Sequence, residues 1–143
     1  MTDFEKLEKE KLHVKKTGTT TLGIICRDAV VVAAERKATM GYLIASKETE
    51  KVLQLDDYIV MTMAGVAGDA QAIARYLRAE FKLFSLQNQR KISMKSAASL
   101  LSNILQGSKF YPYYVQVILA GFDESPKIFD LDAIGSVEEE KKF

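Results

Sequence analysis

Short apolar runs rich in β-branched residues dominate the chain after a charged start. Residues 19–26 and 29–35 form two such runs around Arg27-Asp28, and this pattern predicts a tight hairpin of two strands. The second run is almost continuously apolar, which is typical of a strand covered on both faces. Cys26 falls within the first predicted strand and is expected to be a buried packing residue.

A second hairpin is predicted further along the chain. The apolar runs 51–55 and 58–64 flank the turn Asp56-Asp57, and a looser segment at 40–45 with a turn near Gly41 precedes them. Both strands of this hairpin are rich in residues that favour a pleated, half-buried surface.

The hydrophobic period then changes from two to between three and four. This spacing predicts a long helix with one broad apolar face, formed by Ala70, Ile73, Ala74, Leu77, Phe81 and Phe84. Asp69 lies near its start, where an acidic side chain suits the helix dipole. Ser93 is expected to cap a second helix that stops at Gly107.

Strands return in the last third of the chain, at 111–121 and 127–132. Strands, then helices, then strands indicate an α+β fold in layers. The helices can cover only one face of the early strands. We therefore expect a second sheet, a partner, or residues beyond this sequence to cover the other.

The amino-acid composition excludes several classes of binding and catalytic site. The chain has 143 residues, which suits one domain, and 20 Lys and Arg against 19 Asp and Glu leave a net charge of +1, too low for a dedicated nucleic-acid binder. One Cys and one His, His13, exclude a disulfide framework, a Cys- or His-based metal site and a Ser-His-Asp triad. No apolar run reaches the length of a membrane span, and no secretory signal is present, so the default location is the cytoplasm.

The junction Gly18-Thr19 carries the first candidate chemistry. Residues 3–16 alternate acids and bases with few apolar positions, which predicts a frayed helix or a disordered arm before the buried strand. If the peptide bond before Thr19 is cut, Thr19 gains an α-amino group of pKa about 7.7–8.0 beside its own hydroxyl. Such an amine activates the hydroxyl as a nucleophile. The alternative is that residues 17–21 are only a β-branched start of a strand.

Further candidates are a lysine, an acid and a glycine. Lys51 lies among apolar strand residues; if buried near Thr19, it would stabilise loss of the hydroxyl proton, with Glu35 as its acidic partner. An exposed strand-edge lysine is the alternative. Gly65 lies at a strand-to-helix turn, where backbone N–H groups suit an oxyanion, or where Gly65 and Gly68 simply serve the turn geometry.

Several spaced motifs occur in a recognisable order. They are Thr-Gly-Thr-Thr-Thr-Leu-Gly-Ile at 17–24, Asp-Ala-Val-Val-Val-Ala-Ala-Glu-Arg at 28–36, Ala-Thr-Met-Gly at 38–41, Met-Thr-Met-Ala-Gly-Val-Ala-Gly-Asp-Ala-Gln at 61–71, Leu-Leu-Ser-Asn-Ile-Leu at 100–105 and Tyr-Pro-Tyr-Tyr-Val-Gln at 111–116. Together these motifs resemble the β subunits of archaeal-type proteasomes, which are N-terminal-nucleophile hydrolases. The resemblance implies a four-layer αββα sandwich. It also implies that residues 1–18 are a propeptide and that residues 19–143 are the N-terminal part of the hydrolase domain.

The resemblance implies roles for single residues. It makes Thr19 the nucleophile after autocatalytic cleavage between Gly18 and Thr19, with Glu35 and Lys51 in support and Gly65 as the oxyanion donor. The backbone of Thr39 and Ala67 would bind substrate as an added strand. The S1 pocket, which takes an apolar side chain, would be lined by Ala38, Thr49, Leu53, Met63 and Ala67. No cofactor or metal is implied.

The resemblance also implies partners: other β subunits, rings of α subunits, an ATP-driven unfoldase and unfolded polypeptides, with no nucleic acid or membrane. The family's chains continue past residue 143, with supporting Ser and Asp residues and a second helical layer, so the fold is expected to be incomplete at its C-terminus. The main hypothesis is a threonine endopeptidase subunit. The alternatives are a non-catalytic structural subunit of the same ring and an amidohydrolase acting on a small amide.

Overall fold

The structure of the chain is a computed structural model that describes residues 20–36, 38–40, 43–46 and 50–140. The elements in these residues are β1 (Thr21–Ile25), β2 (Val30–Ala34), β3 (Ala38–Met40), β4 (Leu43–Ser46), β5 (Val52–Asp56), β6 (Ile59–Gly65), α2 (Ala67–Asn88), α3 (Met94–Gly107), β7 (Val115–Phe122), β8 (Pro126–Leu131) and β9 (Val137–Glu140). The order of strands, helices and strands is the predicted α+β order.

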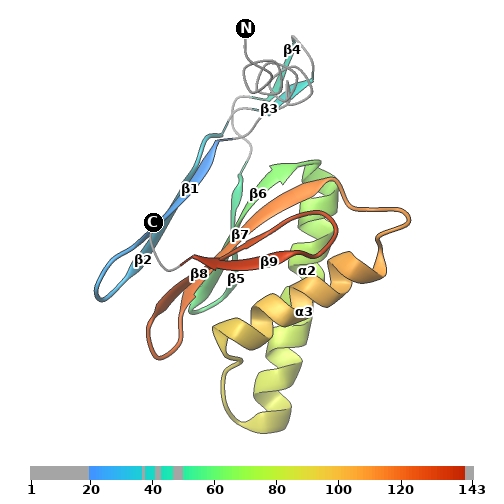
Figure 1. Ribbon diagram of the computed structural model, residues 1–143. Helices are drawn as coiled ribbons and strands as arrows, with labels where there is room; N and C mark the ends of the chain where they lie inside the picture. Colours follow the sequence, from blue (N-terminus) through green and yellow to red (C-terminus); the bar gives the residue numbers. More distant parts are fainter. Residues whose placement is uncertain (1–19, 37, 41–42, 47–49, 141–143) are drawn as a thin grey trace, which may run out of the picture.

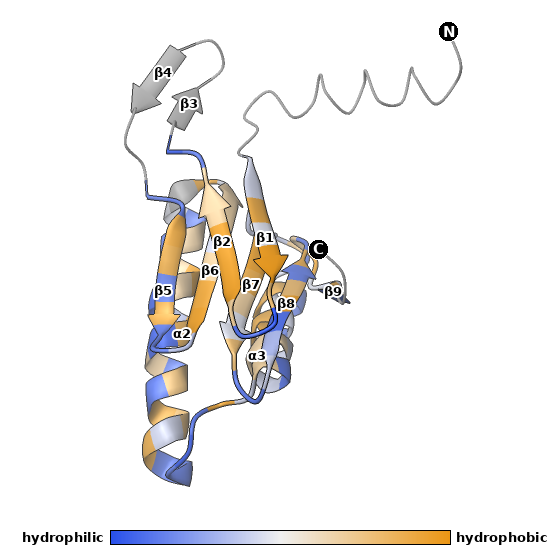
Figure 2. Cartoon of the chain, turned by 90° about the vertical axis from the view of Figure 1, so that its left-hand side faces the viewer, coloured by the Kyte–Doolittle hydropathy of each residue, from blue (hydrophilic) through white to orange (hydrophobic). Residues whose placement is uncertain are grey.

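All the elements except strands β3 and β4, which pair with each other in a separate sheet, form three layers (Figure 1). The middle layer is a five-stranded sheet in the order β5-β6-β7-β8-β9, with every neighbouring pair antiparallel. Helices α2 and α3 cover one face: α2 contacts β5 and β6, and α3 contacts β7, β8 and β9. The β1–β2 hairpin lies across the other face and contacts β5 to β8 (Figure 2). A helical layer outside that hairpin is not among the described residues.

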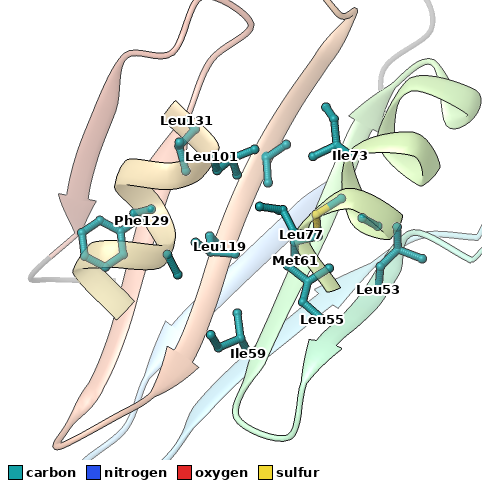
Figure 3. Packing of buried hydrophobic residues seen from close by; sticks show 14 of the residues in the cluster. Leu53, Leu55, Ile59, Met61, Ile73, Leu77, Leu101, Leu119, Phe129 and Leu131 are labelled. Atoms are coloured by element: carbon teal, nitrogen blue, oxygen red, sulfur yellow. The ribbon is translucent and has the colours of Figure 1, made fainter. Parts of the chain in front are cut away.

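The hydrophobic core lies between the five-stranded sheet and the two helices (Figure 3). The sheet contributes alternate side chains such as Met61, Met63 and Leu119, and the helices contribute Leu77 and Leu101, all nearly inaccessible to solvent. These are the positions that the periods of two and of three to four mark in the sequence. Burial on this scale is the main stabilising contribution to the fold.

The β1–β2 hairpin has one packed and one open face. In the described part of the chain, Leu22, Ile24 and Val31 are exposed, while the residues between them are half-buried against the sheet. The two strands pair in a regular antiparallel register from Thr21↔Ala34 to Ile25↔Val30. The near-continuous apolar pattern of β2 therefore has only one of its faces covered by described residues.

Three expectations about local structure were wrong. Cys26 is exposed, because β1 ends at Ile25 and the Cys26 N–H instead closes the hairpin turn to the Ala29 carbonyl at 2.8 Å. The strand expected from Tyr111 begins only at Val115: Pro112 has no N–H for a ladder, and the Tyr114 N–H bonds the Asp69 side chain instead of a strand. Strand β9 was missed because its sequence, Val-Glu-Glu-Glu, has a low β-propensity and is held by pairing with β8.

The remaining predicted elements are confirmed. Both hairpins form, and the long helix extends beyond its predicted apolar stripe at each end. Ser93 is the N-cap of α3, and its hydroxyl accepts a hydrogen bond from the Ser96 N–H. Neither helix in the described residues is long and apolar enough to cross a membrane.

Candidate active site

Glu35 and Lys51 meet at the end of the molecule where β1 and β5 begin and β2 and β6 end (Figure 1). Glu35 directly follows β2, and Lys51 directly precedes β5. The Lys51 Nζ lies 3.8 Å from the Glu35 Oε1. The predicted pairing of these two side chains is therefore present, and the exposed strand-edge alternative for Lys51 does not hold.

The pair is asymmetric in its burial. The Lys51 side chain is 6% exposed, whereas that of Glu35 is 40% exposed. A charged ammonium leaves water only where partners stabilise it, and here the carboxylate supplies such a partner. The backbone carbonyl of Lys51 accepts a hydrogen bond from the Met63 N–H at 3.0 Å, which fixes the base of this side chain to β6.

Glu35 also holds the backbone at the start of the hairpin. Its N–H donates to the Thr20 carbonyl at 3.2 Å, and its Oε1 accepts a hydrogen bond from the Thr20 N–H at 3.3 Å. A single carboxylate thus joins the residue that follows Thr19 to the ammonium of Lys51. Glu35 therefore contacts both Lys51 and the residue that directly follows Thr19, the predicted nucleophile.

Gly65 is the last residue of β6, at the end of the sheet where Lys51 lies. Its φ is +123°, and a Cβ at this position would overlap the Tyr114 carbonyl oxygen, so only glycine fits without strain. Strand N–H groups alternate between the two edges, and the Met63 N–H already points to the Lys51 side. By this alternation the Gly65 N–H is directed to the Lys51 side as well.

The predicted pocket residues are placed only in part. Leu53 and Met63 are buried and belong to the core beneath the Lys51 end of the sheet. Ala38 and Thr39 belong to strand β3, and Ala67 is the first residue of α2. Gly18, Thr19 and Thr49 lie outside the described residues, as does the predicted propeptide, so their expected roles stay predictions.

A groove of about 660 Å³ lies at the opposite end of the sheet from Lys51. It is formed around Lys91, Met94 and Asp123, at the α2–α3 connection and the β7–β8 turn. Burial acts to raise the pKa of Asp123, but hydrogen bonds from Lys127 and from three backbone N–H groups outweigh it and lower this pKa to about 2. These bonds explain a stable corner of the fold, and nothing in them suggests a reaction.

The described residues hold no group of three or more His, Cys, Asp or Glu side chains that could bind a metal. At the Lys51 end of the sheet, the described residues bring together the Lys51 ammonium, the Glu35 carboxylate and backbone N–H groups. That set suits stabilisation of a developing negative charge on oxygen.

The two packed sheets with helices on one side form an α+β sandwich, as the resemblance to N-terminal-nucleophile hydrolases implies. Comparison with known families matches residues 15–143 to the proteasome subunit family, and the chain belongs to that family.

Curated relatives agree with this assignment. A proteasome subunit beta of Methanocaldococcus vulcanius is 50% identical over 128 residues, which cover 88% of this chain and 57% of the relative. Proteasome subunit beta 2 of Aeropyrum pernix is 46% identical over 129 residues, covering 90% and 59% of the two chains. Proteasome subunit beta 1 of Thermococcus onnurineus is 48% identical over 127 residues, covering 89% and 63%. The chain thus spans about three-fifths of the length of these archaeal relatives.

Proposed function

We propose that the chain is a threonine-type endopeptidase subunit of a proteasome core, which cuts its own chain between Gly18 and Thr19 and then degrades unfolded polypeptides. The observation that carries this proposal is the double role of Glu35. Its carboxylate bonds the Thr20 N–H at 3.3 Å and lies 3.8 Å from the Lys51 ammonium. The residue next to Thr19 is thereby tied to the only strongly buried lysine in the described residues.

The proposed reaction begins with the Thr19 hydroxyl. Its oxygen attacks the substrate carbonyl carbon while the proton passes to the Thr19 α-amine, which has no need of a histidine. The Lys51 charge favours the deprotonated oxygen, and the Gly65 N–H donates to the oxyanion that forms. The amine then protonates the leaving nitrogen, and an ester to Thr19 remains. Water hydrolyses that ester, with the amine as base, and restores the hydroxyl.

The proposed substrate is an extended polypeptide. Its backbone pairs as an added strand with the backbone of Thr39 in β3 and of Ala67 at the start of α2. The side chain before the cut bond enters a pocket formed by Ala38, Thr49, Leu53, Met63 and Ala67. Because Leu53 and Met63 are apolar and buried, the pocket favours apolar side chains.

The proposed assembly follows from the word "subunit" in the relatives' names. We propose that the chain packs with other β subunits in a ring, that α-subunit rings flank it, and that an ATP-driven unfoldase supplies substrate through them in the cytoplasm. Sequestration inside stacked rings would restrict the peptidase to unfolded chains.

The test is to produce the full-length protein together with the α subunit of its source and to determine its intact mass and N-terminal sequence. We expect a chain that begins at Thr19 and hydrolyses a fluorogenic peptide with an apolar residue before the cut bond. Thr19→Ala should keep residue 1 and lose hydrolysis, whereas Thr19→Ser, which retains a hydroxyl, should still be processed. Assembled particles that keep residue 1 and cut nothing would instead identify a structural subunit. Hydrolysis of small amides alone would identify an amidohydrolase.

A further inference from the structure

Between strand β6 and helix α2, Val66 pairs with Tyr114, the residue before β7, through only one backbone hydrogen bond. Val66 has an extended backbone, with φ −76° and ψ 120°, and is the N-cap of α2. Its N–H donates to the Tyr114 carbonyl at 2.8 Å. This bond continues the antiparallel ladder by one residue beyond Gly65↔Val115.

In a regular antiparallel ladder, the two residues of such a pair exchange both hydrogen bonds. Here the second bond cannot form, because the Val66 carbonyl turns toward the helix and accepts from the Ala70 N–H at 3.2 Å. The Tyr114 N–H instead donates to the Oδ2 of Asp69 at 3.0 Å. The Asp69 carboxylate thus replaces the Val66 carbonyl in the ladder.

We infer that Asp69 is a positioning residue for the oxyanion site, and this inference rests on the proposed function of Gly65. The Asp69 carboxylate and the Val66 N–H together clamp Tyr114 against the β6–α2 turn. Gly65 lies directly between the ladder and this clamp, packed so closely on the Tyr114 carbonyl that no Cβ fits. Holding Tyr114 therefore fixes the Gly65–Val66 peptide, which directly follows the peptide that carries the Gly65 N–H.

The clamp is a specific use of this side chain. Val66 makes no side-chain cap, so the N–H groups in the first turn of α2 lack a capping side chain. An acidic residue in this turn commonly accepts hydrogen bonds from such N–H groups. The carboxylate instead bridges to a different strand 45 residues away. A catalytic donor must be held close to its productive geometry, and a backbone turn gains that rigidity only from such external bonds.

The chain offers a matched control at the other helix. The Met94 N–H, at the start of α3, donates to the Asp123 Oδ2 at 2.9 Å, so Asp123 also ties a helix start to the end of a strand. This second tie lies at the opposite end of the sheet from Gly65 (Figure 1). Its loss should cost stability without moving the oxyanion donor.

The experiment compares Asp69→Ala, Asp69→Asn and Asp123→Ala in the full-length protein assembled with its α subunit. For Asp69→Ala we expect kcat for a fluorogenic peptide to fall about tenfold, with KM within about twofold, since donor geometry acts on the transition state. Asp69→Asn keeps an acceptor oxygen and should stay within about threefold of the parent. Asp123→Ala should lower Tm at least as much as Asp69→Ala and leave kcat unchanged.

Three results would overturn the inference: an unchanged kcat in Asp69→Ala, no rescue by Asp69→Asn, or an equal loss of kcat in Asp123→Ala. Hydrogen exchange at the Tyr114 amide reads the clamp without catalysis. Asp69→Ala should accelerate it, and unchanged exchange would also refute the clamp. If the parent is neither processed nor active while Tyr114 exchange responds to Asp69→Ala, the proposed function fails and the clamp stands as a structural tie only.

Discussion

The Lys51 ammonium and the Glu35 carboxylate lie 3.8 Å apart, yet the lysine is 6% exposed and the acid 40% exposed. The buried partner is therefore the cation, and solvent reaches the pair from the carboxylate side. Burial strengthens the field of the ammonium, because fewer water molecules screen it. This arrangement suits a group whose charge acts on a neighbouring oxygen rather than one that only stabilises the fold.

Replacing this lysine should separate catalysis from stability. Lys51→Met keeps an apolar stem of similar length and removes the charge, so Tm should stay within a few degrees of the parent or rise. Self-processing and peptide hydrolysis should fall by at least about 10²-fold, which intact mass and a fluorogenic peptide would measure.

The control is Lys91→Met, which removes an exposed lysine that pairs with Asp57 at 2.8 Å. That change should leave processing and hydrolysis as in the parent. A fully processed and active Lys51→Met protein would contradict the role proposed for Lys51.

Gly65 offers a test of backbone geometry. Gly65→Ala should destabilise the protein by at least about 2 kcal/mol, because its φ of +123° strains an L-residue and the new Cβ meets the Tyr114 carbonyl. Denaturant unfolding of the purified protein would measure the loss. Gly68→Ala is the control: its added Cβ meets nothing within 4 Å, and alanine favours the helix, so stability should rise by about 0.5–1 kcal/mol. Equal effects of the two changes would show that Gly65 is not under strain.

The sequence predicted most of this fold because hydrophobic periods report burial directly. The core positions of β6 and α2 follow periods of two and of three to four, and the structure buries them. It could not predict β9, since a run of glutamates becomes a strand only through its partner β8. The sequence also indicated that one face of the early strands would need further cover, but it could not say which face of β2 this is, because an apolar run does not show which of its faces is packed.

The residues of the candidate site were partly predictable from the sequence, but their contacts were not. Glu35 and Lys51 were identified from their residue types and from a family resemblance, and the structure adds their contact. Asp69 was expected only to favour a helix dipole. Its bond to Tyr114, 45 residues later, depends on how β6 and β7 pair, which no local pattern encodes.

Acidification should lower the stability of the folded chain through protonation of Asp123. The unperturbed pKa of 3.8 falls to about 2 in the folded chain, since hydrogen bonds outweigh burial. The carboxylate therefore contributes stability above about pH 4 and loses it as the pH falls from about 3.8 toward 2, by at most roughly 2 kcal/mol.

Asp123→Asn should remove this part of the pH dependence, measured as Tm between pH 2 and pH 6. Asp57→Asn is the comparison: Lys91 lowers the pKa of Asp57 too, but that pair is exposed and should contribute little in salt. An unchanged acid limb in Asp123→Asn would contradict the assignment.

Unlike Asp123, Thr62 is a buried polar residue whose hydroxyl lacks hydrogen bonds among the described residues and is expected to lower the stability of the fold. It lies at the centre of β6 with no exposed surface, and its Oγ1 has no hydrogen-bond partner in the part of the chain that the structure describes. A hydroxyl taken out of water without a partner costs about 1–3 kcal/mol. Thr62→Val replaces that hydroxyl with a methyl group of similar shape, so the free energy of unfolding should rise by about 1 kcal/mol. Thr62→Ala, which leaves a cavity as well, should not show this gain. Denaturant midpoints at constant m-value would compare the three proteins, and a destabilised Thr62→Val would show that the hydroxyl has a partner in the folded protein.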